Sequence, residues 1–374
     1  MSSLKYWIWL SAKDGVGAVS AKSLIDHFGT PEQVYNAGTE EYKYVEGLKS
    51  GDRSKLCDKN LDAANKILAA CAEKGCRPIA LHDSEYPERL KYIYDPPIVL
   101  YVRGRLPAVD ELPVIAIVGT RNCTPYGIAT AENIACDLAR RGFLIATGLA
   151  RGVDTAAARG ALRGGSGVLG VIGSGTDVVY PPENKELYDA VAANGAVISE
   201  YPPGTPSLAG HFPARNRIIS GLSLGVAVLE APKKSGALIT ATRALEQGRD
   251  VFAMPGNVDA KSCEGSNALL REGAIPLLSA ENIIEEYEDL FPMIVNPEKG
   301  IDNKGVVEYI DLDAILAQLE GDERLAAEAI GKKSLLVDDI VLASGLPANR
   351  VLSALTMLEI KGCARRAGQL YSLC

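Results

Sequence analysis

From Val114 onward, the chain repeats a short apolar run, a glycine-rich turn, an amphipathic stretch and a further glycine. Runs that are apolar on both faces are typical of buried parallel strands, and the amphipathic stretches between them predict crossover helices. The pattern therefore predicts a doubly wound, Rossmann-like α/β sheet of six or seven strands. The expected strands are Val114–Val118, Phe143–Thr147, Val168–Ile172, Ala196–Ser199, Gly225–Leu229, Val251–Met254 and Ile275–Leu278.

Helix signals between these runs agree with that prediction. Thr124 can cap a helix that begins with Pro125, and Gly142 stands where a left-handed residue would end it. Further helices are expected from Asn184 to Asn194, from Pro213 onward, and from Ser235 to Gln247.

The segments on either side of the sheet follow other patterns. The first 75 residues are expected to be helical, and a Gly-Val-Gly turn at 15–17 resembles a helix-hairpin-helix, although a plain helical hairpin explains it equally well. Near the C-terminus, two helical stretches and a hairpin around Ala367-Gly368 predict a winged helix. The predicted parts are a helical domain (1–75), a sheet domain (76–290), an acidic linker (291–330) and a winged helix (331–374).

Composition supports a chain of two or three globular domains. It has 374 residues, of which 47% are hydrophobic and 23% charged, so disordered and collagen-like classes are excluded. The net charge of −8 is concentrated in residues 283–330, which hold 13 acidic and 3 basic residues, and the rest of the chain is close to neutral. Local charge at a site, rather than net charge, decides whether anions bind there.

No apolar run is long enough to predict a membrane span or a secretory signal, so we expect a cytoplasmic protein without membrane contacts. The eight cysteines include no CxxC pair and lie mostly in apolar segments. They are expected to be reduced thiols, and no metal site is predicted.

Glycine-rich turns follow several of the expected strands, at the edge of a parallel sheet where ligands bind. The turns begin at Gly119, Gly148 and Gly173, and the run after the fifth strand adds Lys233, Ser235 and Gly236. Loops without Cβ atoms that abut helix N-termini form sites for anions such as phosphate.

Basic and aromatic side chains accompany these turns. Arg121 lies in the first loop, where its guanidinium can pair with a phosphate, although a salt-bridged surface arginine explains it equally well. Arg215 and Arg217 supply further charge, Asn216 can bond a base edge or a phosphate, and Phe212 can stack on a base. Nucleic acid is therefore a suitable ligand for the predicted crevice.

Other nucleotide chemistries are disfavoured. The chain has neither a complete G-x-G-x-x-G fingerprint nor a G-x-x-x-x-G-K-[ST] loop, so no dinucleotide cofactor or P-loop ATPase is expected. Its three histidines are scattered, and only His211 lies near the crevice. Asp154, Asp177 and Glu230 are expected to cap helices or brace loops rather than to catalyse.

Several long blocks resemble the DNA-processing protein A family, also called Smf. They occur in order along nearly the whole chain and include Val118-Gly119-Thr120-Arg121, Gly148-Leu149-Ala150-Arg151-Gly152-Val153-Asp154, Phe212-Pro213-Ala214-Arg215-Asn216-Arg217 and Ser235-Gly236-Ala237-Leu238-Ile239-Thr240. The resemblance implies an extended Rossmann-like domain, a sterile-alpha-motif or helix-hairpin-helix-like domain before it, and a winged helix after it.

The resemblance also implies a function without catalytic turnover or cofactor. Members of this family bind and protect incoming single-stranded DNA in natural transformation, and they help to load RecA recombinase past single-strand-binding protein. They typically act as homodimers. The predicted DNA-binding residues, in part carried over by motif position, are Gly119, Thr120, Arg121, Gly173, Phe212, Arg215, Asn216, Arg217, Lys233, Ser235 and Gly236.

The chain departs from the family pattern in one basic position. Some members have a lysine shortly before the phenylalanine, whereas this chain has Leu208-Ala209-Gly210-His211, so Lys233 or Lys234 is expected to compensate. A nucleotide phosphoribohydrolase or transferase on a similar sheet is the alternative, with Glu230 as general base. Residues 235–240 replace the Pro-Gly-Gly-x-Gly-Thr turn that such enzymes have, which disfavours it.

Overall fold

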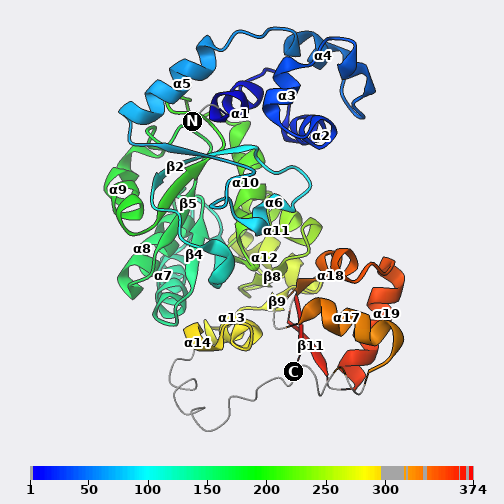
Figure 1. Cartoon of the computed structure of the whole chain (residues 1–374). Helices are drawn as coiled ribbons and strands as arrows, with labels where there is room; N and C mark the ends of the chain where they lie inside the picture. The colour runs from blue at the N-terminus through cyan, green and yellow to red at the C-terminus, as the bar shows by residue number, and fades with distance from the viewer. Residues whose placement is uncertain are drawn as a thin grey trace. The chain divides into compact units, whose positions relative to one another are not determined.

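The structure is a computed structural model, and it describes residues 3–295, 316, 319–331, 335–361, 363–367 and 370–373 (Figure 1). The chain forms two compact units, residues 1–280 and residues 281–374.

Nine strands form the sheet of the first unit, in the order β1-β2-β6-β5-β4-β3-β7-β8-β9. All seven predicted strands are present and pair in parallel, which confirms the expected α/β class. They are β3 (Val114–Val118), β4 (Leu144–Thr147), β5 (Val168–Val171), β6 (Ala196–Ser199), β7 (Gly225–Val228), β8 (Asp250–Ala253) and β9 (Ile275–Pro276).

Two further strands extend the sheet beyond β6. Strand β2 (Val99–Gly104) pairs antiparallel with β6, and β1 (Arg77–Ala80) pairs antiparallel with β2. The sequence pattern did not predict them, because they lie in the proline-rich segment between residues 76 and 113, called the connector below. Pro78 is tolerated in β1 because this is the edge strand, where a residue without a backbone N–H costs least.

Crossover helices connect the parallel strands, and Figure 1 shows α7 and α8 grouped apart from α10 and α11. The predicted caps are confirmed: Thr124 accepts a hydrogen bond from the Gly127 N–H at 3.1 Å, and Gly142 is left-handed with φ 80°. The helices are α6 (Glu88–Lys91), α7 (Pro125–Arg140), α8 (Val153–Gly164), α9 (Lys185–Asn194), α10 (His211–Leu222), α11 (Gly236–Glu246) and α12 (Glu264–Arg271).

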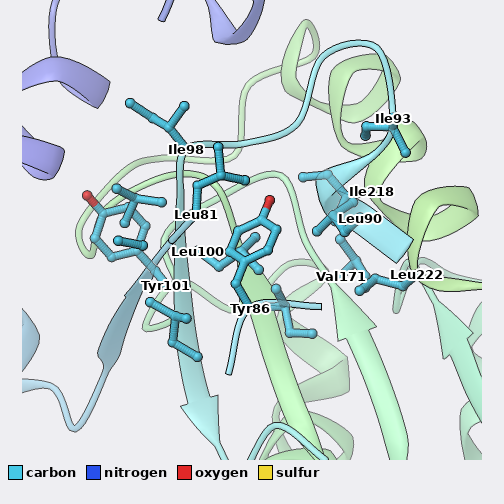
Figure 2. Packing of buried hydrophobic residues seen from close by; sticks show 14 of the residues in the cluster. Leu81, Tyr86, Leu90, Ile93, Ile98, Leu100, Tyr101, Val171, Ile218 and Leu222 are labelled. Carbon is cyan, nitrogen blue, oxygen red and sulfur yellow. The ribbon is translucent and has the colours of Figure 1, made fainter. Parts of the chain in front are cut away.

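Helix α10 begins at His211, two residues before the predicted start at Pro213. Proline fits there because the N–H groups of a helix's first turn have no intrahelical partner. The connector packs on one side of α10, where Figure 2 shows Leu90 and Ile93 beside Ile218 and Leu222. This packing sets which face of α10 is directed toward the sheet edge.

The N-terminal segment is helical, as predicted, and the turn at residues 15–17 joins its first two helices. Trp7 and Ile8 belong to the same hydrophobic core as Val99 and Leu100 of β2. The boundary between residues 75 and 76 stays a prediction, since both segments share this core. The helices are α1 (Leu4–Ser11), α2 (Ala18–Phe28), α3 (Pro31–Asn36), α4 (Ser50–Leu56) and α5 (Asp62–Glu73).

The second unit contains the expected winged helix. Strand β12 pairs antiparallel with both β10 and β11, and the turn predicted at Ala367-Gly368 falls partly outside the described residues. The elements are α13 (Glu281–Tyr287), α14 (Pro292–Val295), α17 (Gly321–Ile330), β10 (Leu335–Leu336), α18 (Val337–Ser344), α19 (Ala348–Ile360), β11 (Ala364–Ala367) and β12 (Leu370–Leu373).

The predicted acidic linker is wrong over residues 321–330, because that stretch forms α17. Ala326, Ala327 and Ile330 are buried in the same core as Leu355 of α19. The linker was predicted from the excess of acidic residues, which lie on the outer side of this helix. That excess hid the apolar stripe on its inner side. Residues 296–315 of the predicted linker lie outside the described residues.

Among the residues that the structure describes, no single helix is long and apolar enough to cross a membrane. Helices α18 and α19 are long and apolar enough only when they are taken together, and a bend of 109° separates them. Both helices bury apolar side chains in the core of the second unit.

Candidate nucleic-acid interface

A pocket of about 320 Å³ lies at the edge of the sheet where β3 and β7 end. The chain runs outward from β3 to β6 and returns at β7 beside β3, so this is the point where the strand order reverses. Eight of the eleven predicted residues line the pocket: Gly119, Thr120, Arg121, Phe212, Arg215, Asn216, Ser235 and Gly236.

Two glycines let the loop after β3 lie directly against the start of α8. A Cβ on Gly119 would lie 2.5 Å from Val153 Cγ2. Gly152 has φ 77°, and a Cβ there would come within 2.7 Å of the Arg121 carbonyl oxygen. Side chains at either position would force the loop away from the sheet, so the glycines determine where Arg121 begins.

Glu230 braces the same loop from the end of β7. Its backbone oxygen accepts from the Thr120 N–H at 2.7 Å, and its carboxylate accepts from the Thr124 N–H at 2.8 Å and from the Thr124 hydroxyl. A carboxylate at this helix start also interacts favourably with the dipole of α7. Glu230 is only 2% exposed and both oxygens are engaged, so its geometry is that of a cap, as expected.

Arg121 and Phe212 meet at the rim of the pocket. The guanidinium carbon of Arg121 lies 5.1 Å from the centroid of the Phe212 ring, within the range of a cation–π contact. Tyr180 continues this row, because its ring centroid is 5.6 Å from that of Phe212. Arg121 is exposed and forms no ion pair with any residue that the structure describes.

Arg215 lies beneath the pocket rather than at its rim. It is 4% exposed and donates from Nη2 to the Gly148 carbonyl at 3.2 Å, while its Nε has no partner among the described residues. Burial raises the pKa of the neighbouring Asp154, and the positive charge of Arg215 opposes that shift. Arg215 stays protonated at neutral pH and adds positive charge from below.

The N-terminus of α11 forms the opposite wall. The Ser235 hydroxyl accepts from the Ala237 N–H at 3.2 Å, and Asn216 donates from Nδ2 to the Gly236 carbonyl at 3.2 Å. Nothing lies within 4 Å of a Cβ built on Gly236, so an anion can approach the first N–H groups of the helix.

The pocket side of α10 follows helical spacing. Phe212, Arg215, Asn216 and Ile219 occupy positions i, i+3, i+4 and i+7, and all four line the pocket. Position 217 is 200° around the helix from position 215 and therefore faces the opposite side.

Arg217, which the sequence predicted to contact DNA, does not line the pocket. Arg217 is 5% exposed and forms ion pairs with Glu200 at 2.7 Å and with Asp95 at 3.1 Å. It attaches the outer side of α10 to the connector and to the end of β6, and its donors are occupied within the protein.

A family model described as DNA recombination-mediator protein A matches residues 77–288. The chain belongs to the DNA recombination-mediator protein A family. A second model, the DprA winged helix domain, matches residues 312–369 and so begins within the predicted linker.

Relatives of this family resemble the chain over most of its length. Protein Smf of Synechocystis is 33% identical over 390 residues, covering 96% of each chain. The X-ray structure of DNA processing protein A from Streptococcus pneumoniae has a TM-score of 0.66 and 34% identity, covering 75% of this chain and 97% of that one.

A third relative has a solved structure that is described by the ligand of that protein. A solved structure of DNA processing protein A from Helicobacter pylori, which concerns that protein's single-stranded DNA binding mode, has a TM-score of 0.51 and 31% identity. It covers 56% of this chain and 94% of that chain.

Two other predicted residues of this family member lie outside the pocket. Gly173 is buried beneath His211, since a Cβ on Gly173 would lie 3.2 Å from the His211 Cβ, and it positions the start of α10. Lys233 lines a separate cleft, whereas Lys234 lines the pocket.

Sequence reasoning missed Ile219 and the contact of Tyr180 with Phe212, and it left open whether Lys233 or Lys234 serves the pocket. Ile219 was identifiable from its i+7 spacing to Phe212, whereas nothing in the pattern of a Lys-Lys turn shows which lysine faces the pocket. The contact of Tyr180 with Phe212 joins the loop after β5 to the start of α10, and nothing in the local sequence pattern signals it. Among the described residues, no group of three metal-ligating side chains was found.

Proposed function

We propose that this protein binds single-stranded DNA in the pocket at the edge of its sheet. Arg121, Lys234 and the N-terminus of α11 would hold backbone phosphates, while Phe212 would stack on a base. Buried Arg215 would add favourable charge from beneath. The observation that carries the proposal is the exposed guanidinium of Arg121 stacked over Phe212, which presents charge and an aromatic face together.

A single strand fits this arrangement better than a duplex. Stacking on Phe212 requires a base that is already unstacked, and every base has a π-face, so the contact tolerates any sequence. The family relationship supports the same ligand, because the Helicobacter pylori relative is described by its single-stranded DNA binding mode.

The proposal includes binding without turnover. Glu230, the general base of the alternative phosphoribohydrolase function, caps α7 with both carboxylate oxygens. Asp154 is buried and accepts from the Gly148 N–H at 3.1 Å, so its contacts are those of a loop brace.

Family membership also supports the finer part of the proposal. We infer that the protein protects incoming DNA in transformation and helps to load RecA recombinase past single-strand-binding protein in the cytoplasm, working as a homodimer. The winged helix would then serve contacts other than those in the pocket.

Fluorescence anisotropy with a labelled mixed-sequence 20-mer over a salt series tests the pocket. Arg121→Ala should weaken binding about tenfold at 50 mM salt and reduce the salt slope by about 0.7, the effect of one lost phosphate contact. Arg159→Ala, which removes an exposed cation from α8 outside the pocket, is the matched control. Equal affinities for Arg121→Ala, Lys234→Ala and the unmodified protein would overturn the proposal, and release of free base from nucleoside monophosphates would favour the phosphoribohydrolase.

A further inference from the structure

The Lys233-Lys234 turn separates two neighbouring concave sites. Lys234 lines the DNA pocket, whereas Lys233 lines a second cleft of about 410 Å³ together with Asn267 and Arg271 of α12. Val258, from the loop after β8, and Glu264 complete its rim. Both concavities therefore lie among loops at the carboxyl ends of the parallel strands, on either side of one turn.

Hydrogen bonds fix the second cleft to the first. The N–H groups of Gly265 and Ser266 donate to the Ala231 carbonyl at 2.7 and 3.2 Å, which docks the start of α12 on the residues that precede the lysine turn. A Cβ on Gly265 would lie 2.7 Å from that same carbonyl oxygen, so this close approach requires glycine. These contacts fix the position of the α12 wall of the cleft relative to Lys233.

The other wall is held equally firmly. Asn267 accepts from the Gly256 N–H and donates to the Gly256 carbonyl, both at 3.0 Å. This reciprocal pair ties α12 to the loop after β8. Asn267 is therefore committed to the protein backbone and leaves ligand contacts to the charged residues of the cleft.

The charge of the cleft is positive and available. Lys233 and Arg271 are exposed, and neither side chain forms an ion pair or hydrogen bond with a residue in the part of the chain that the structure describes. Some other exposed arginines of this unit are paired, as Arg151 is with Glu183 and Arg163 with Glu132. Glu264 is the one carboxylate among the described residues that line the cleft, so two cations outweigh it.

We infer that this cleft is a second phosphate subsite for the same DNA strand. This inference rests on the proposed function: the backbone would leave the pocket at Lys234, cross the turn, and place later phosphates against Lys233 and Arg271. No aromatic side chain lines the cleft among the described residues, so the ligand is the phosphodiester backbone alone, read without regard to sequence.

Oligonucleotide length tests the inference. Labelled dT4 is short enough to occupy the pocket alone, whereas dT20 also reaches the cleft. The double variant Lys233→Ala/Arg271→Ala should weaken dT20 at least about tenfold at 50 mM salt, lower the salt slope by about 0.7 for each lost contact, and leave dT4 binding unchanged. Glu264→Gln should act oppositely and tighten dT20 only.

Controls separate this inference from the proposed function. Lys233→Arg/Arg271→Lys should retain dT20 binding because it keeps both charges, and Arg159→Ala should change neither oligonucleotide. Arg121→Ala should weaken dT4 and dT20 alike. If Arg121→Ala does so while the Lys233→Ala/Arg271→Ala variant binds dT20 normally, the subsite is refuted and the pocket stands. If Arg121→Ala changes neither, the proposed function itself fails, and equal weakening of dT4 and dT20 by the double variant would show that the cleft is not a distinct subsite.

Discussion

The guanidinium of Arg121 lies 5.1 Å from the Phe212 ring centroid, although the two residues belong to elements that follow different strands. The contact holds a charge and a π-face at one rim before any ligand arrives. Side chains that are already ordered lose less conformational entropy on binding. The pair therefore joins the two interactions that a flexible polynucleotide offers, phosphate charge and base stacking.

Phe212 and Arg121 should contribute in separable ways. Phe212→Leu keeps an apolar side chain but loses the aromatic face on which one base stacks. The binding free energy for a 20-mer should therefore become less favourable by about 1–3 kcal/mol, with the salt slope unchanged. Arg121→Gln should instead reduce the slope. Anisotropy titrations over a salt series measure both quantities, and a reduced slope in Phe212→Leu would contradict the assignment of roles.

Arg217 should stabilise the fold without contacting DNA. Arg217→Met leaves the Glu200 and Asp95 carboxylates without their shared buried cation, and should lower the free energy of unfolding by about 3–5 kcal/mol. Trp7 and Trp9 are the only tryptophans of the chain and are buried in the first unit, so their fluorescence reports urea unfolding there. DNA affinity per folded molecule should not change.

The matched control for that substitution is Arg163→Met. Arg163 forms an exposed ion pair with Glu132, and such pairs contribute little because water screens them. Its unfolding curve should overlay that of the unmodified protein. If Arg217→Met lost DNA binding while its unfolding curve stayed unchanged, Arg217 would be a DNA-binding residue and the prediction would be wrong.

Gly148 makes room for Arg215. A Cβ at position 148 would overlap the Arg215 guanidinium, which is buried and has little freedom to move. Gly148→Ala should therefore destabilise the first unit by about 1–3 kcal/mol and weaken DNA binding as Arg215 is displaced. Gly51→Ala at an exposed position of α4, where nothing lies within 4 Å of the new Cβ, is the control and should be neutral or slightly stabilising. Wild-type melting and binding in Gly148→Ala would show that Arg215 need not stay in place.

Lys59 should make stability depend on alkaline pH. Its Nζ lies 5.0–5.4 Å from the ring centroids of Trp9, Tyr35 and Tyr42. Burial lowers the pKa of Lys59 to about 8, and nearby Cys57 partly opposes the shift. The unfolded chain retains a pKa of about 10.4, so between these values the unfolded state binds more protons and stability rises with pH.

Lys59→Met removes this titration while retaining an unbranched apolar stem among the rings. Urea unfolding from pH 7.5 to 10 should show the unmodified protein gaining stability relative to Lys59→Met as pH rises through 8. Alkaline titrations of groups that do not interact with Lys59 occur in both proteins and cancel in the difference. A difference that stays constant over this range would contradict the lowered pKa.

Periodicity predicted the parallel sheet because buried strands and crossover helices impose patterns on neighbouring residues. The same local information failed where long-range packing decides. The acidic surface of α17 concealed the buried stripe formed by Ala326, Ala327 and Ile330, and β1 became a strand only because β2 offers it an edge.

The candidate site divides along the same line. Sequence alone determined that glycine turns, Arg121 and the Phe212–Asn216 segment would meet at one sheet edge, because parallel strands bring their carboxyl ends together. Only the tertiary structure decided that Arg215 lies beneath the pocket, that Arg217 is held by Glu200, and that Lys234 rather than Lys233 enters it. Those outcomes depend on which neighbours pack against each side chain, and such neighbours come from distant parts of the chain.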